Sequence, residues 1–355
     1  MRGFFAPILS SFYGLAISIR HAMFDWGWHH SLEYDIPIVC VGNLTVGGTG
    51  KTPVCEFLIE QLGRQYNIAL LSRGYGRRTK GYLEVQTNSP FRDTGDEPKQ
   101  IKLKYPGTVV AVCEDRREGI AEIRRRHPET NLILMDDGFQ HRWVEPWANI
   151  ILMDYNRPIY NDHLLPWGSL RDKPSQLYRA NFIIITKCPS DLTPLEARIV
   201  KKSLRLYPYQ SIYFTWFKSS DTIALFSDTT PQKLARGSKV IAMAGIGNPG
   251  PFVEQLGKDY DVAGELIFKD HHPYRMIDLE RMREALAAAG PDAYIVTTEK
   301  DAVKLTNRKR IPDDIANKLY YISVNIKFAE GHESSFTRKL REYVRTNQKH
   351  SLLHS

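Results

Sequence analysis

A lysine and a threonine follow a cluster of glycines near the start of the chain, in the stretch best suited to chemistry. Residues 45–52 read T-V-G-G-T-G-K-T. Glycines let backbone N–H groups turn toward phosphate oxygens, a lysine here reaches the β- and γ-phosphates, and the next hydroxyl can hold Mg²⁺. The spacing therefore predicts a phosphate-binding loop (P-loop) made of Thr45, Val46, Gly47, Gly48, Thr49, Gly50, Lys51 and Thr52.

The flanking residues decide between a P-loop and an ordinary glycine-rich turn, because the usual P-loop pattern has glycine where this chain has Thr45. Residues 36–41 form an apolar run typical of a buried parallel strand. Apolar residues at helical spacing follow Lys51, and Pro53 fits the first turn of a helix. Strand, glycine loop and helix in this order favour the P-loop.

Two further loops carry charged residues directly after apolar runs. Residues 132–135 end in Asp136 and Asp137, where P-loop proteins place a carboxylate that holds Mg²⁺. Residues 68–71 lead into a loop with Arg73, Tyr75 and Arg77. Open α/β sheets bind ligands at the carboxyl ends of their strands, although this loop could also be a solvated basic loop.

Two motifs in the second half of the chain are weaker. Residues 245–250 read G-I-G-N-P-G, but Pro249 and Pro251 remove N–H groups that a dinucleotide would need. Asp270, His271 and His272 combine a carboxylate with imidazoles, and their spacing does not indicate a metal site.

The order of the elements predicts an α/β protein with two parts. Strands alternate with helical segments over residues 35–210, which is typical of a doubly wound, mostly parallel sheet carrying the P-loop. Residues 211–217 and 222–226 are expected to be two strands joined by a turn at 218–221. They would lead into a second, smaller α/β domain, so that residues 211–347 form one unit with its linker.

The first 34 residues predict an amphipathic helix. Apolar side chains recur at helical spacing on one face, with Arg2, Arg20, Trp26 and Trp28 around them. The apolar stretch is short for a membrane-spanning helix. Two alternatives remain: a helix lying in a membrane interface, or a helix docked on its own domain.

Composition limits the class of protein. The 355 residues are 42% hydrophobic and 25% charged, as in an ordinary globular protein, with a net charge of +8. That charge favours an anionic partner: a nucleotide, a nucleic acid or an acidic membrane surface. The 4 cysteines show no C-x-x-C pair, which favours a reduced, cytosolic environment without a zinc site.

Seven motifs, in order along the chain, resemble those of the tetraacyldisaccharide 4'-kinase family. They are VGNLTVGGTGKTP at 41–53, SRGYGRR at 72–78, GDEP at 95–98, DDGFQH at 136–141, LLPWGSLRD at 164–172, FKDHH at 268–272 and TTEKDAVKL at 297–305. The P-loop with few glycines is itself a trait of that family.

The resemblance implies an ATP-dependent kinase, with Mg²⁺, that phosphorylates the 4'-hydroxyl of a tetraacylated glucosamine disaccharide 1-phosphate in lipid A biosynthesis. It implies peripheral association with the cytoplasmic face of the bacterial inner membrane and a two-strand linker between the domains. By resemblance, Asp96 and His271 form a dyad that acts as the general base, and Lys51 and Arg171 face the phosphoryl group. Arg73, Tyr75, Arg77 and Gln140 would bind substrate. Thr52, Asp136, Asp137 and Asp172 would serve the metal, although the family usually has glutamate where this chain has Asp172.

Other functions fit the residues less well. A membrane-associated ATPase switch of the partitioning type carries a signature lysine where this chain has Val46. A GTPase would carry an aspartate two residues after Lys187, and this chain has Pro189 there. No recognition motif or aromatic platform supports a nucleic-acid partner.

Overall fold

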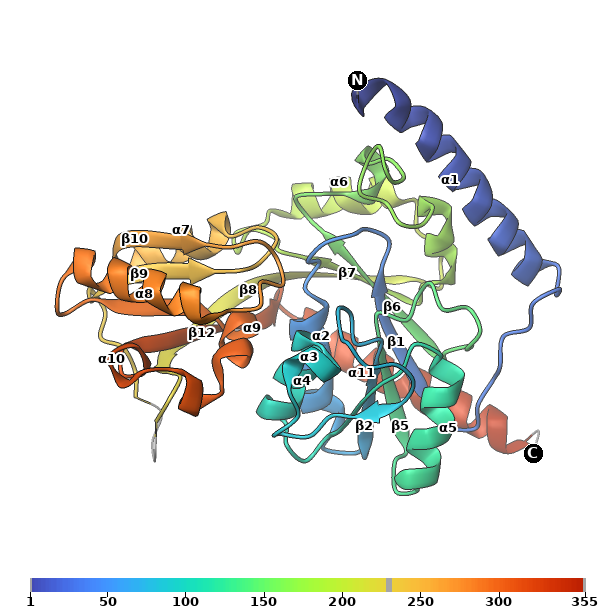
Figure 1. The fold of residues 1–355 in the computed structure, drawn as a ribbon. Coiled ribbons are helices and arrows are strands. Elements are labelled where there is room, and N and C mark those ends of the chain that lie inside the picture. The colour runs from blue at the N-terminus through green and yellow to red at the C-terminus, as the bar shows by residue number, and fades with distance from the viewer. Residues whose placement is uncertain (1, 228–231, 354–355) are drawn as a thin grey trace.

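The computed structural model describes residues 2–227 and 232–353, and its centre is one 12-stranded sheet with helices on both faces (Figure 1). The strand order is β10-β9-β11-β12-β8-β7-β6-β1-β5-β2-β4-β3. The strands are β1 (Ile38–Asn43), β2 (Ile68–Ser72), β3 (Leu83–Glu84), β4 (Val109–Val112), β5 (Leu132–Asp136), β6 (Ala148–Asp154), β7 (Phe182–Thr186), β8 (Ser211–Ala224), β9 (Lys239–Ala244), β10 (Asp261–Ile267), β11 (Tyr294–Thr298) and β12 (Leu319–Phe328).

The helices connect these strands and cover the sheet. They are α1 (Arg2–Asp25), α2 (Lys51–Leu62), α3 (Phe91–Thr94), α4 (Asp96–Lys104), α5 (Arg116–Arg126), α6 (Pro194–Leu204), α7 (Gly250–Asp259), α8 (Met276–Ala289), α9 (Glu299–Ala302), α10 (Asp313–Ala316) and α11 (His332–Leu353). Four short 3₁₀ segments are η1 (Ile159–Asn161), η2 (Pro174–Arg179), η3 (Val303–Leu305) and η4 (Arg308–Arg310). The expectation of an α/β fold with a mostly parallel sheet is confirmed.

The central strand β1 lies between β5 and β6 and runs parallel to both. Its six residues are fully buried, so the apolar run from the sequence is a strand covered on both faces. Val41 of β1 pairs with Asp136 at the end of β5. Because parallel strands end at the same edge, the glycine loop after β1 and the acids after β5 are neighbours.

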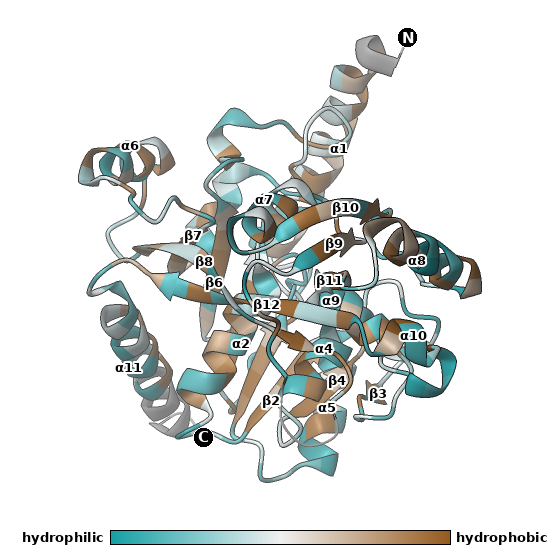
Figure 2. Ribbon diagram, turned by 90° about the vertical axis from the view of Figure 1, so that its left-hand side faces the viewer, coloured by the Kyte–Doolittle hydropathy of each residue, from teal (hydrophilic) through white to brown (hydrophobic). Residues whose placement is uncertain are grey.

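The two faces of the sheet bury alternate residues of β1. Val39 and Val41 pack in a core that α2 and α11 complete, whereas Ile38 and Cys40 pack in the core under α5. Figure 2 shows the strands as mostly hydrophobic against more polar helices. This two-sided burial makes the sheet doubly wound.

The expected turn at residues 218–221 is wrong, because β8 is one continuous strand from Ser211 to Ala224. It runs parallel to β7 and antiparallel to β12, so it joins the two halves of the sheet. Two of the polar residues that suggested a turn pair in the ladder with β12, Lys218 with Asn325 and Ser219 with Val324, and the register shifts at the other two, Ser220 and Asp221. The division at residue 211 that we proposed from the sequence coincides with the start of β8, and it stays a proposal.

Helix α1 projects beyond the rest of the chain at its N-terminal end (Figures 1 and 2). One face docks: the Ser10 hydroxyl donates to the Leu164 carbonyl at 2.8 Å, and the Tyr13 hydroxyl donates to the Arg171 carbonyl at 3.0 Å. The other face exposes large apolar side chains, namely Ile8, Leu9, Phe12, Leu15 and Ile19. Among the described residues, none of the helices has the length and apolarity needed to cross a bilayer. The prediction of a docked helix therefore holds for one face of α1, and the exposed apolar face leaves the membrane alternative open.

Candidate active site

The P-loop connects β1 to α2 and depends on glycine geometry at two positions. Gly47 has φ +94° and Gly50 has φ +87°, the left-handed region that L side chains avoid. A Cβ atom on Gly50 would lie 2.4 Å from the Phe217 ring. Gly50 also caps the N-terminus of α2, where the first-turn amides have no helical partner. A helix N-terminus open in this way is a binding site for phosphate oxygens.

Neighbouring segments hold the loop in this shape. The Val46 amide donates to the Ser169 carbonyl at 2.8 Å, and the Asn43 side chain donates to the Thr49 hydroxyl at 2.8 Å. Lys187 donates to the Gly48 carbonyl at 2.5 Å. Because these bonds fix the loop from outside, the first turn of α2 can face a ligand.

Two cations meet one carboxylate beside the loop. Arg171 donates to both carboxylate oxygens of Asp137, and Lys51 Nζ lies 3.6 Å from that carboxylate. Burial alone would raise the pKa of Asp137, but the hydrogen bond from Arg171 and the Lys51 charge hold it well below its usual range. The structure therefore brings the expected Lys51, Arg171 and Asp137 together. A bound phosphate would compete with Asp137 for both cations.

The buried Asp136 is suited to a cation. It accepts a hydrogen bond from the Ser72 hydroxyl at 3.0 Å, and burial, Glu97 and Asp137 together raise its pKa to about 6. A divalent ion nearby would favour its charged form. No cluster of three or more ligating side chains lies within the described ranges 2–227 and 232–353. Mg²⁺ commonly takes only one or two protein oxygens plus phosphate and water, so Thr52 and Asp136 fit it.

Asp172 lies apart from the other expected metal residues. Its buried carboxylate meets His21 Nε2 of α1 at 2.8 Å and the Lys173 amide at 2.9 Å. Arg179 is 3.8 Å away. Within the described part of the chain, no hydrogen bond or ion pair joins it to Asp136 or Asp137. Its metal role stays a prediction that these contacts do not support.

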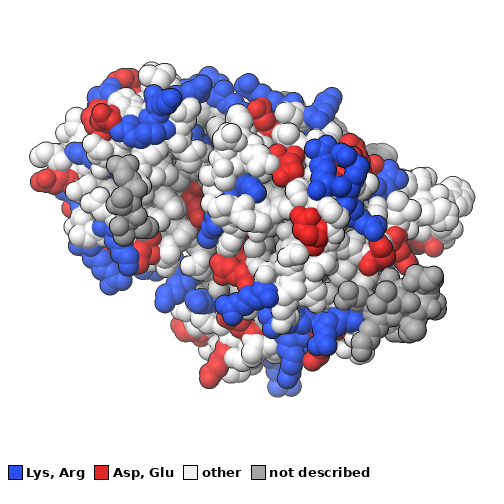
Figure 3. Space-filling view, turned by 90° about the horizontal axis from the view of Figure 1, so that it is seen from below, with Lys and Arg blue, Asp and Glu red and all other residues white. Residues whose placement is uncertain are grey.

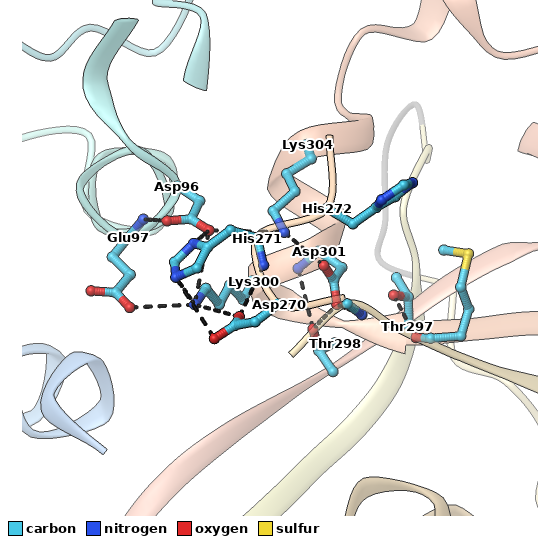
Figure 4. Close-up of polar contacts among 12 residues, drawn as sticks. Asp96, Glu97, Asp270, His271, His272, Thr297, Thr298, Lys300, Asp301 and Lys304 are labelled. Carbon is cyan, nitrogen blue, oxygen red and sulfur yellow. Dashed lines mark hydrogen bonds and ion pairs between the residues drawn. The ribbon is translucent and has the colours of Figure 1, made fainter. Parts of the chain in front are cut away.

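Asp96 and His271 meet across the two halves of the chain (Figure 4). Asp96 begins α4, His271 lies in the loop after β10, and His271 Nδ1 is 2.8 Å from the carboxylate. Burial opposes the charged form of Asp96, but the His271 hydrogen bond and nearby lysines lower its pKa to about 2. The same hydrogen bond raises the pKa of His271. An imidazole held by a buried carboxylate can accept a proton.

The expected substrate residues lie in different settings. Tyr75 is 74% exposed, and its ring centre is 5.4 Å from that of His271. Arg73 is exposed. Arg77 instead donates to Glu114 at 2.7 Å, and Gln140 donates to the Asn43 carbonyl at 2.9 Å. Substrate binding by these four residues stays a prediction, with Tyr75 the one that contacts the Asp–His pair.

Sequence reasoning missed several residues that hold the site. Asn43 accepts from Arg171, Ser72 binds Asp136, and His21 binds Asp172. Lys300 lies beside His271. Lys300 belongs to the TTEKDAVKL stretch that carries the resemblance, so a signal existed for it. Nothing in the sequence linked His21 to Asp172, which follows 151 residues later.

A doubly wound sheet with a P-loop after its central strand, and a lysine and arginine beside that loop, defines a P-loop nucleotide-binding α/β protein. A sequence profile described as Tetraacyldisaccharide-1-P 4'-kinase matches residues 3–345. The chain therefore belongs to the tetraacyldisaccharide-1-phosphate 4'-kinase family, as the motifs indicated.

Proteins similar to this chain carry the same description. A "Tetraacyldisaccharide 4'-kinase" of Porphyromonas gingivalis is 40% identical over 341 residues, covering 94% of each chain. One of Bacteroides thetaiotaomicron is 36% identical, covering 97% of this chain and 93% of its own. The fold resembles the structure described as "apo" form LpxK from Aquifex aeolicus in complex with ATP. That match has a TM-score of 0.74 and 24% identity, covering 95% and 97% of the two chains.

Proposed function

We propose that this chain is an ATP-dependent kinase that phosphorylates the 4'-hydroxyl of a tetraacylated glucosamine disaccharide 1-phosphate in lipid A biosynthesis. Family membership supports the reaction. The observation that carries the proposal is the Asp96–His271 hydrogen bond, 2.8 Å long, between the half with the P-loop and the C-terminal half. A switch ATPase orients a water molecule for hydrolysis, whereas a kinase must take a proton from the hydroxyl of an acceptor substrate.

Phosphoryl transfer requires positioning and charge neutralisation more than covalent chemistry. The P-loop would hold the β- and γ-phosphates at the N-terminus of α2. Lys51 and Arg171, released from Asp137, would neutralise the charge of the transferred group. Thr52 and Asp136 would hold Mg²⁺ together with phosphate oxygens, and the ion would supply further positive charge against the phosphates. The other assigned metal residues, Asp137 and Asp172, would act at most through neighbouring residues.

The Asp96–His271 pair would supply the base. As the 4'-oxygen bonds to the γ-phosphorus, the bond from phosphorus to the bridging oxygen breaks and ADP leaves. The hydroxyl proton passes to the Asp–His pair. General-base assistance of this kind contributes about 10²–10⁴-fold. Tyr75, exposed beside His271, is the side chain best placed to meet the sugar.

We also propose that α1 lies in the cytoplasmic leaflet of the bacterial inner membrane as a peripheral anchor. Its outward face is apolar, and Trp26 and Trp28 just beyond it are 72% and 71% exposed. Tryptophan is favoured at the boundary between lipid and water. A lipid substrate would then reach the site from the surface on which the enzyme rests.

The test is transfer of label from γ-labelled ATP to a synthetic tetraacyldisaccharide 1-phosphate. The wild-type protein is expected to label the lipid, and Lys51→Ala, with an unchanged melting temperature, to keep less than about one tenth of that rate. ATP hydrolysis without labelled lipid would instead favour the partitioning-type ATPase. A folded Lys51→Ala variant with full activity would overturn the P-loop assignment.

A further inference from the structure

Lys300 places one ammonium group among four polar partners at the junction of the two halves (Figure 4). Its Nζ is 3.4 Å from His271 Nε2 and 3.5 Å from Asp270 in the same loop. It is 3.5 Å from Glu97 and 3.9 Å from Asp96, both on α4. A single lysine therefore connects α9, α4 and the histidine loop.

The backbone beneath Lys300 is fixed by its neighbours. The adjacent Asp301 is fully buried, accepts the Gly245 amide at 2.8 Å and pairs with Lys304 at 2.9 Å. The Gly245 carbonyl in turn accepts the His271 amide at 3.2 Å. The segment that presents Lys300 thus also holds the loop that presents His271, so their relative positions are set by the fold.

We propose that Lys300 is a positioning residue for phosphoryl transfer. It holds the Asp96–His271 pair together and keeps that pair unprotonated, and so able to act as a base, down to lower pH. This inference rests on the proposed kinase function. In neutral His271, Nδ1–H donates to Asp96, and the ammonium of Lys300 can donate to the lone pair on Nε2. One imidazole tautomer is thereby favoured, with its basic nitrogen on the side of Lys300.

The sign of the effect follows from the charges around the imidazole. His271 is faced by Asp96 of α4, Asp270 of its own loop, Lys300 of α9 and the Tyr75 ring. Glu97 of α4 pairs with Lys300, and Lys304 of η3 lies behind Asp96. Asp96, chiefly through its hydrogen bond, and Asp270 raise the pKa of the imidazole, whereas burial and Lys300 lower it. Loss of the lysine charge must therefore move protonation of the pair to higher pH.

The experiment compares Lys300→Met, which has no charge, with Lys300→Arg, which keeps it. The acidic limb of the kcat/KM profile should move up by about half a unit to one unit in K300M. It should move much less in K300R. At a pH on that limb, kcat should fall while the KM for ATP stays unchanged. Lys269→Met is the control, because Lys269 is exposed in the same loop and no side-chain ion pair is found for it among the described residues.

A second readout separates this proposal from the kinase assignment. The pKa of His271 is measured by NMR of labelled histidine in the protein without substrates, and it should rise in K300M whether or not lipid is phosphorylated. If K300M does not fold, Lys300→Gln takes its place. An unchanged His271 titration in a folded uncharged variant would overturn the role of Lys300. Equal shifts in K300M and K269M would do the same.

Discussion

Single residues in this site are held by partners that are distant in sequence. Asp137 illustrates this: its backbone is left-handed, with φ +50°, and it binds a lysine from α2 and an arginine 34 residues further on. Both cations are therefore already oriented before phosphate arrives. Preorganised charge of this kind is the main contribution a protein makes to phosphoryl transfer.

At this scale we predict that Asp96 and His271 act as one unit. Each single alanine variant should lose about 10²–10⁴-fold in kcat, and the double variant should lose little more than either single one. The loss should appear in kcat, because the proton moves only as the transition state forms. Rates are measured at saturating ATP and lipid, with melting temperatures as the control. Multiplicative losses would mean that the two residues have separate tasks.

The P-loop could be predicted residue by residue because its signal is local: glycines, lysine and threonine at fixed spacing between a strand and a helix. The partners of Arg171 and Asp172 could not. Asp172 is buried against His21 because α1 folds back onto residues 164–173, a contact between two polar residues that no periodicity reveals. Lys300 lies within the TTEKDAVKL motif, but the motif alone predicts no role for it, because that role depends on the position of His271.

At the scale of elements, a buried acid cluster joins α2, α4 and α9. Lys104 of α4 lies 2.7 Å from Glu56 of α2 and 3.5 Å from Glu299 of α9. Gln100 donates to both acids, at 2.9 and 3.2 Å. Burial and the neighbouring Glu299 raise the pKa of Glu56 to about 7. Lys104 thus pairs with two carboxylates whose mutual repulsion disfavours the state in which both are charged.

We predict that this cluster makes stability depend on pH. Between about pH 4.5 and pH 7 the folded chain keeps a proton that the unfolded chain releases, so unfolding becomes easier as pH rises. Glu56→Gln should remove this dependence of the free energy of unfolding on pH. The melting temperature of the variant relative to wild type should therefore increase from pH 5 to pH 8, by about 2–4 °C for each kcal/mol of difference in the free energy of unfolding. Glu60→Gln, exposed on the same helix, should show no such trend. A parallel response of E56Q and wild type would contradict the prediction.

The order of strands and helices could be predicted, but the connection between the halves could not. The polar residues 218–221 are typical of a turn, yet they continue β8 because β12 pairs with Lys218 and Ser219 and again with Thr222, across a shift of register at Ser220 and Asp221. Strand β12 itself comes some 100 residues later and was not expected. A long-range pairing overrode the local preference.

At the scale of the whole molecule, the net charge of +8 is not gathered in one stripe on the face seen from below. There, basic side chains form separate clusters with acidic ones between them (Figure 3). Contact with lipid would therefore depend on apolar burial by α1 as well as on charge.

We predict that changing Phe12, Leu15 and Ile19 to serine releases the protein from vesicles containing anionic lipid. These side chains are 67%, 57% and 54% exposed, so their loss should leave the fold intact. Each buried apolar side chain is worth about 1.5–3 kcal/mol, so binding should weaken by at least about 100-fold. Sedimentation with vesicles measures it. The control is Met276→Ser with Ile277→Ser, equally exposed on α8. Undiminished binding of the folded triple variant would contradict the prediction.

The docking of α1 has a consequence for the design of shortened forms of the protein. Deleting the helix would remove Tyr13 from the Arg171 carbonyl and His21 from the buried Asp172. The strip at residues 164–173 also supports the P-loop, through Ser169 and the Val46 amide. A truncated protein would therefore lose contacts that hold Arg171 and Asp172 and, through the same segment, support the P-loop. The better design keeps the whole helix and replaces only its exposed apolar side chains with polar ones.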